Sequence, residues 1–132
     1  MRVRRSREPD DRGSAPVEFV LVGTMLTFLT LGVLQFGFAV YVRNVVHDAA
    51  VDGAYHAALA DTSLSAGAER TRRVIARTVG GEYAQDVTAA PGTIAGDPVV
   101  VVTVRATLPL LGLAGIPRGV EVTAHAPVES LE

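Results

Sequence analysis

Residues 19–42 limit the possible folds of this chain more than any other segment. They form a run of 24 residues without a formal charge, FVLVGTMLTFLTLGVLQFGFAVYV. A helix of this length rises about 36 Å, whereas the hydrocarbon core of a bilayer is about 30 Å thick. A cleaved secretory signal has a shorter apolar region, of about 7–15 residues, with an A-x-A-like site directly after it. The only such triplet nearby is residues 58–60, far beyond the run. We therefore predict a retained, single-pass transmembrane helix in the cell membrane.

The arginines on the two sides of this span predict its orientation. Residues 1–13, MRVRRSREPDDRG, carry five arginines, whereas only Arg43 lies in the eighteen residues after the span. By the positive-inside rule the N-terminus is cytoplasmic and everything after about residue 43 is extracytoplasmic. The leader 1–13 has too few apolar residues to fold alone.

Glu18 places a carboxylate directly before the first residue of the apolar span. The fourteen Leu, Phe and Val residues of the span favour insertion by about 4–8 kcal/mol, and a carboxylate at the bilayer centre costs about 2.5–3.5 kcal/mol. Insertion therefore tolerates the charge. One interpretation is that Glu18 is a first-turn residue stabilised by the helix dipole. The other gives it a function together with Gly13, which stands five residues earlier.

The order Gly13, then S-A-P-V, then Glu18-Phe19 and an apolar run resembles the class III signal peptide of type IV pilin-like proteins. This resemblance implies that a prepilin peptidase cuts between Gly13 and Ser14. It also implies that Glu18, with Phe19 beside it, sets the register of packed subunits. In that family the glutamate neutralises the new N-terminal amine of a neighbouring subunit.

Further residues narrow the resemblance to the TadE-like family, over about residues 13–58. They are L-Q-F-G at 34–37, Y-V-R-N at 41–44, D-A-A at 48–50 and G-A at 53–54. The family comprises minor pilins, or pseudopilins, of tight-adherence (Flp-type) pilus systems. The implied partners are prepilin peptidase, other pilin-like subunits and the Tad secretion machinery, beside membrane lipid.

Beyond the span the helix is expected to continue to about residue 60, forming a transmembrane and stalk helix over 14–60. A stripe of mostly small residues follows one face at helical spacing: Val42, Val45, Val46, Ala49, Gly53 and Ala57. Small residues let helices approach closely. We therefore expect helix packing at Ala49 and Gly53, and in the span at Gly23, Gly32 and Gly37.

Residues 64–132 are expected to form a small extracytoplasmic head, so the predicted class is α+β. Apolar residues from Leu64 to Val79 follow helical spacing, and Gly80-Gly81 ends that helix. Alternation predicts a weak strand at 85–89 and strong strands at 99–108 and 119–126, the last two as an antiparallel hairpin. The connection 109–118, PLLGLAGIPR, is unusually apolar. It either tucks onto the sheet or offers a contact surface.

Other function classes find little support in the composition or motifs. A net charge of −2 argues against nucleic-acid binding, and the lack of cysteine excludes disulfides and thiolate chemistry. His47 and His56, near Asp48 and Asp52, could suggest a metal site, but they fall on opposite helix faces. No phosphate loop, G-x-G-x-x-G or catalytic serine motif occurs. We predict no enzymatic activity, cofactor, metal or small-molecule substrate.

The resulting hypothesis is a pilin-like minor subunit or assembly factor of a Flp/Tad-type pilus, processed after Gly13. It would reside in the cell membrane and could be incorporated into an extracellular pilus. The alternative is an unprocessed, signal-anchored extracytoplasmic module whose hairpin and apolar loop bind a ligand or partner.

Overall fold

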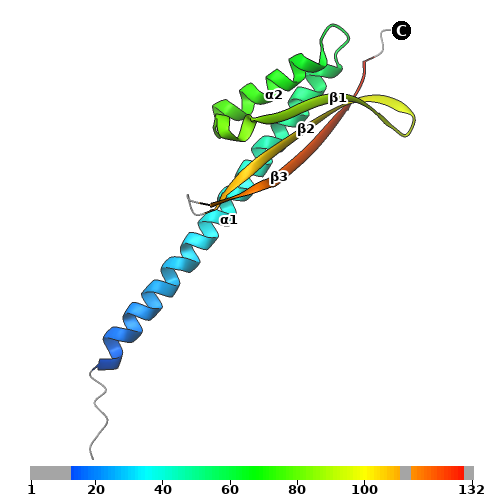
Figure 1. The fold of residues 1–132 in the computed structure, drawn as a ribbon. Coiled ribbons are helices and arrows are strands. Elements are labelled where there is room, and N and C mark those ends of the chain that lie inside the picture. The colour runs from blue at the N-terminus through cyan, green and yellow to red at the C-terminus, as the bar shows by residue number, and fades with distance from the viewer. Residues whose placement is uncertain (1–12, 111–113, 130–132) are drawn as a thin grey trace, which may run out of the picture. The chain divides into compact units, whose positions relative to one another are not determined.

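The structure is a computed structural model that describes residues 13–110 and 114–129. Its elements are the helices α1 (Ser14–Ala58) and α2 (Leu64–Thr78), the short 3-10 helix η2 (Gly81–Ala84), and the strands β1 (Asp86–Ile94), β2 (Asp97–Leu110) and β3 (Ala114–Pro127) (Figure 1). The chain divides into two compact units, one ending at Leu34 and one beginning at Gln35. The predicted α+β class, with one long apolar helix, a second short helix and a small antiparallel sheet, is confirmed.

In the first unit, every described residue of α1 is exposed, so the helix there turns its apolar side chains outward. The hydroxyl groups of Thr24, Thr27 and Thr30 donate to main-chain carbonyls four residues earlier, at 2.7–2.8 Å. A hydroxyl in hydrocarbon finds no water, so such internal bonds are the available way to satisfy it. This part of α1 is therefore suited to a lipid environment.

The second unit contains a three-stranded antiparallel sheet in the order β1-β2-β3. As alternation predicted, every second residue is buried from Val100 to Ala106 in β2 and from Val120 to Ala126 in β3: Val100, Val102, Val104, Ala106, Val120, Val122, Ala124 and Ala126. These side chains belong to the same hydrophobic core as buried residues of α1 and α2. The sheet thus packs one face on the helices and leaves the other, with its threonines and charges, toward solvent.

The strands run further than the sequence predicts. The connection predicted at 109–118 is largely strand, since Leu110 pairs with Ala114 after a register shift between Ala106 and Leu108. Residues 111–113 lie outside the described part. Strand β1 continues to Ile94, five residues beyond the predicted end at 89. Pro91 weakens the strand signal there, but β1 is an edge strand, where a missing N–H is tolerated.

Helix α2 has the predicted boundaries. The Ser63 hydroxyl accepts from the Ala66 N–H at 3.2 Å as its N-cap. The helix ends ahead of Gly80, whose φ of 122° is open to glycine but strained for other residues. Of the predicted apolar face, Ala68, Thr71 and Ile75 are buried, and Leu64 and Val79 pack against the core.

The part of the α1 stripe from Ala49 to Ala57 is covered by the chain's own α2. A Cβ built on Gly53 would clash with the Thr71 hydroxyl and lie 2.7 Å from the Gly67 carbonyl oxygen; one on Gly67 would lie 2.5 Å from the Gly53 oxygen. Such contacts fall well below van der Waals distance, so glycine is required on both helices. Within the stripe, Val42, Val46, Ala49, Gly53 and Ala57 are all buried.

The C-terminal end of α1 is tied to the end of β3. The Glu129 N–H donates to the Ala58 carbonyl at 3.0 Å, and the Thr62 hydroxyl donates to the carbonyls of Leu59, at 3.1 Å, and His56. Carbonyls in the last turn of a helix lack partners within it, so these bonds satisfy two of them, those of His56 and Ala58, and also the carbonyl of Leu59 just beyond the helix. They also fix which end of β3 lies beside the end of α1.

Replacing Thr71 by valine should destabilise the head by about 1–2 kcal/mol. The Thr71 side chain is fully buried, and its hydroxyl donates to the carbonyls of Ala49 at 3.2 Å and Gly67 at 3.1 Å. Thr78→Val is the matched control, because that exposed hydroxyl donates to the Val74 carbonyl alone. Hydrogen exchange of α2 amides in the full chain in detergent measures both variants. Equal protection of the α2 amides from exchange in the two variants would contradict the view that the Thr71 hydroxyl links α2 to α1.

Candidate functional site

The Gly13–Ser14 peptide bond lies where α1 begins. Gly13 is the first described residue, it is exposed, and a Cβ built on it would meet no atom within 4 Å. Ser14 is the first residue of the helix and is also exposed. The bond is therefore open to approach in the described part of the chain, with no packed side chain to displace before the backbone can be reached.

Pro16 lies in the first turn of α1, two residues after the helix begins. The first four N–H groups of a helix have no partner within it, so a residue without an N–H loses no hydrogen bond there. The proline ring also holds φ near the helical value. Pro16 thus supports a helix start at Ser14.

Glu18 lies just beyond the first turn, which contains no acidic residue. The interpretation of Glu18 as a first-turn dipole residue is therefore wrong by one position, and the dipole falls off within that turn. The Ser14 hydroxyl donates to Glu18 Oε1 at 3.4 Å. A carboxylate offers about four acceptor positions, so this long bond leaves room for a stronger donor. The carboxylate is within reach of residue 14.

The surroundings of Glu18 are apolar and uncovered. Val17 is 66% exposed and Phe19 is 80% exposed, and Glu18 carries the one formal charge between Ser14 and Val42. An unpaired charge facing hydrocarbon is costly, whereas a paired one is tolerated. A cation placed beside Glu18 would lower that cost.

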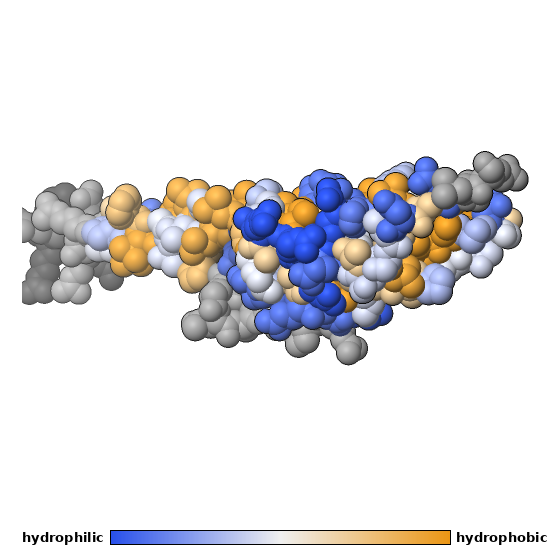
Figure 2. All heavy atoms as spheres, turned by 90° about the horizontal axis from the view of Figure 1, so that it is seen from above, coloured by the Kyte–Doolittle hydropathy of each residue, from blue (hydrophilic) through white to orange (hydrophobic). Residues whose placement is uncertain are grey.

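The residues expected to pack helices fall into two groups. A Cβ on Gly23, Gly32 or Gly37 would meet no atom within 4 Å, so these glycines lie on uncovered helix surface. Ala49 and Gly53 are instead buried in the head. Figure 2 shows mostly hydrophobic residues along the helical part, and a hydrophilic patch with hydrophobic residues beside it on the visible face of the head.

The acidic and histidine residues of α1 are not assembled into a metal site. Among residues 13–110 and 114–129, no group of three or more His, Asp or Glu side chains could hold an ion. Asp52 is instead engaged by Arg70, with Nε to Oδ2 at 2.6 Å and Nη2 to Oδ1 at 3.1 Å. Hydrogen bonding to Asp52, and then its charge, raises the pKa of Arg70. This pair bridges α1 and α2.

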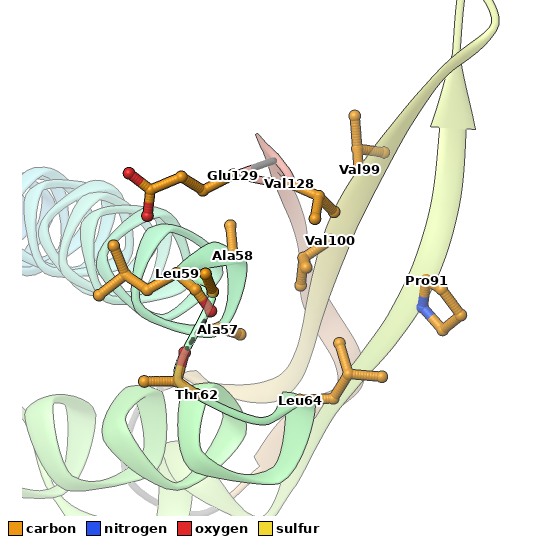
Figure 3. Close-up of a pocket in the computed structure, with 11 residues that line it drawn as sticks. Ala57, Ala58, Leu59, Thr62, Leu64, Pro91, Val99, Val100, Val128 and Glu129 are labelled. Atoms are coloured by element: carbon orange, nitrogen blue, oxygen red, sulfur yellow. Dashed lines mark hydrogen bonds between the residues drawn. The ribbon is translucent and has the colours of Figure 1, made fainter. Parts of the chain in front are cut away.

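An open groove of about 430 Å³ lies at the end of α1, between that helix and the strands (Figure 3). Its lining is mostly alanine, leucine, valine and proline, and its polar side chains are those of Thr62 and Glu129. The Thr62 hydroxyl is bonded to main-chain carbonyls. The groove brings together no nucleophile and base, so its lining supports no catalytic proposal.

Three sets of residues were missed by the sequence patterns. The threonines at 24, 27 and 30 recur every three residues, and that spacing could have identified hydroxyls bonded along a membrane helix. Gly67, in the middle of α2, could have indicated a close helix contact. Glu129 acts through its backbone N–H, and no residue type predicts such a bond.

The fold and the site define a protein with one N-terminal apolar helix, long enough to cross a membrane by length and composition, and an α+β head. A family model described as "TadE-like protein" matches residues 13–54. The predicted resemblance is thereby confirmed over this segment, which includes Gly13, Glu18 and Gly53. Comparison with curated proteins and with solved structures gave no match. These findings fit a single-pass membrane protein related to tight-adherence pili.

Proposed function

We propose that this chain is a pilin-like minor subunit or assembly factor of a tight-adherence (Flp-type) pilus. The observation that supports the proposal best is that three features lie close together at the start of α1. The TadE-like match begins at Gly13, α1 begins at Ser14, and one carboxylate, Glu18, follows on an uncovered apolar helix. A structural subunit needs such a helix surface for its neighbours.

Processing would act on the Gly13–Ser14 bond from the cytoplasmic side of the membrane. Prepilin peptidase would add water across this amide, giving a carboxylate on Gly13 and an amino group on Ser14. An α-amino group has a reference pKa near 8, so it is mostly protonated at neutral pH. The cut therefore creates a cation at the start of α1, beside an apolar surface.

Pairing would then join this ammonium group to Glu18 of a neighbouring subunit. The Ser14 hydroxyl already reaches the Glu18 carboxylate within one chain, which shows that residues 14 and 18 share a helix face. When two such helices pack side by side, each carboxylate can face its neighbour's amine. Because an unpaired charge there is costly, the pair would fix the axial register between subunits.

The exposed glycines support this arrangement. Gly23, Gly32 and Gly37 have no intrachain neighbour that a Cβ would meet, so another helix could approach closely at these positions. We propose that they contact other pilin-like subunits. Membrane lipid, prepilin peptidase and the Tad secretion machinery complete the proposed partners.

Gly13→Leu should slow cutting by more than about tenfold, because a bulky side chain beside the scissile bond obstructs entry of the extended backbone into the protease. Gly13→Ala is the matched control and should be cut at an intermediate rate. Intact mass of each chain after incubation with prepilin peptidase in membranes gives the fraction cut. Wild-type cutting of Gly13→Leu would contradict the assignment and favour the unprocessed, signal-anchored binding module.

A further inference from the structure

One hydrogen bond at the end of β3 shows which way the main-chain groups of that strand point. The Val128 N–H donates to the Pro98 carbonyl at 3.1 Å, on either side of the paired residues Val99 and Pro127. Antiparallel pairs alternate between pairs that bond each other and pairs that do not, so the Val99–Pro127 pair is of the second kind. The buried residues at positions 120, 122, 124 and 126 therefore bond to β2. The residues between them direct their N–H and C=O groups away from β2, and we call them the open edge: Glu121, Thr123 and His125.

The opposite edge of the sheet, along β1, is closed. The same alternation, continued across β2, places the outward main-chain groups of β1 at odd positions, among them Val87 and Pro91. Arg72 Nη2 donates to the Val87 carbonyl at 2.7 Å, and Pro91 has no N–H to offer. Proline and covering side chains are two ways in which proteins protect edge strands from further pairing. The β1 edge is therefore guarded against an added strand.

The open edge of β3 has no such protection. Within the described part of the chain, no hydrogen bond uses its main-chain N–H or C=O groups, and its three residues are exposed. In Figure 1, β3 lies on the side of the sheet away from α2. The edge ends at Pro127, which lacks an N–H, and at Glu129, whose N–H is bonded to the Ala58 carbonyl. One donor and one acceptor thus point outward at every second residue from 121 to 125.

We propose that an extended segment of another pilin-like subunit adds to this open edge as a fourth strand. Donors and acceptors that recur at every second residue match the main chain of a strand, and strand addition of this kind is a common way to recognise an extended segment. A helix could not satisfy them, because its own main-chain groups are bonded internally. The inference rests on the proposed function, which supplies the neighbouring subunit.

The charges of the outer sheet face indicate one residue of the added strand. Asp86, Arg105 and Glu121 lie in one row across β1, β2 and β3, and Arg105 Nε lies 3.3 Å from Glu121 Oε2. Their charges alternate in sign, and opposite charges on neighbouring strands stabilise the pairing. The added strand is therefore expected to carry a lysine or arginine opposite Glu121.

Hydrogen exchange at single residues tests the contact, with the full chain compared in detergent and in pili or co-purified assemblies. Exchange is quenched and then read by NMR. We expect the open-edge amides to exchange at least about tenfold more slowly in assemblies. The amides of Val122 and Ala124, already bonded to β2, should exchange slowly in both states. This alternation is specific to strand addition, because general burial would not select every second residue.

Thr123→Pro tests the same contact by a second route. Proline removes one outward N–H and keeps the β2–β3 bonds, so the fraction of subunit recovered in assemblies should fall severalfold. Thr93→Pro is the matched control, because Thr93 is exposed and points its N–H outward from the guarded β1 edge. It should assemble at the natural level. Denaturant unfolding of both variants in detergent shows whether the head keeps its stability.

Unchanged exchange of the open-edge amides, in assemblies that contain the chain, would overturn the contact and leave the proposed function intact. Slow exchange of these amides in the isolated chain at high concentration would also overturn it, because a second copy would then supply the strand. Absence of the natural chain from all assemblies would instead contradict the proposed function on which the inference rests.

Discussion

Replacing Gly53 by alanine is expected to destabilise the head by about 1–3 kcal/mol. The added methyl group would lie 2.7 Å from the Gly67 carbonyl oxygen and would also meet the Thr71 hydroxyl. The hydroxyl can rotate, but the carbonyl belongs to the α2 backbone, so the helices must separate. Alanine's better helix propensity offsets only about 1 kcal/mol of the loss. Denaturant unfolding of the full chain in detergent, followed by hydrogen exchange in α2, measures the effect.

Gly81→Ala is the matched control for Gly53→Ala. A Cβ at Gly81 meets nothing within 4 Å, so its effect should stay within about 0.5 kcal/mol. The comparison separates two roles for Gly53. If Gly53 served only contacts between subunits, the isolated Gly53→Ala chain would be as stable as the natural one or more so. That result would contradict the α1–α2 contact described above.

Replacing Glu18 by valine is expected to leave membrane insertion intact and to remove the subunit from pili. Insertion gains from the loss of a charge, whereas assembly would leave the Ser14 ammonium group of a neighbour without its partner. Breaking a buried ion pair in this way costs about 3–5 kcal/mol. The fraction of subunit recovered in sheared pili or co-purified assemblies, relative to the membrane fraction, measures the effect.

Glu18→Asp is the control that keeps the charge on a shorter side chain. It should assemble less well than the natural chain but better than Glu18→Val, since the carboxylate can still attract the amine at longer range. Assembly of Glu18→Val at the natural level would rule out the pairing role. A loss of Glu18→Val from the membrane fraction would show that the residue acts in insertion instead.

Much of the fold follows from local patterns in the sequence. The uncharged run predicts the apolar helix, Ser63 and Gly80 border α2 as their residue types suggest, and alternation along β2 and β3 predicts which residues are buried. Each of these signals arises from residues close together in the chain. They could therefore be read without knowing the tertiary structure.

The remaining features depend on contacts between distant segments. The small residues at 49 and 53 could contact a helix of the same chain or a helix of a neighbouring subunit. Only the structure shows that α2 packs on that face. Pro91 weakens the signal for β1, because a sequence does not reveal that the strand is at an edge. At the candidate site, residue order located Gly13, Ser14 and Glu18, but the pairing of Glu18 requires a second subunit.

The most direct test of the proposed function is the intact mass of the protein extracted from membranes of cells with active prepilin peptidase. We expect a chain that begins at Ser14, with its amino group free. A chain that retains residues 1–13 in those cells would contradict processing, and with it the pairing of the Ser14 amine with Glu18.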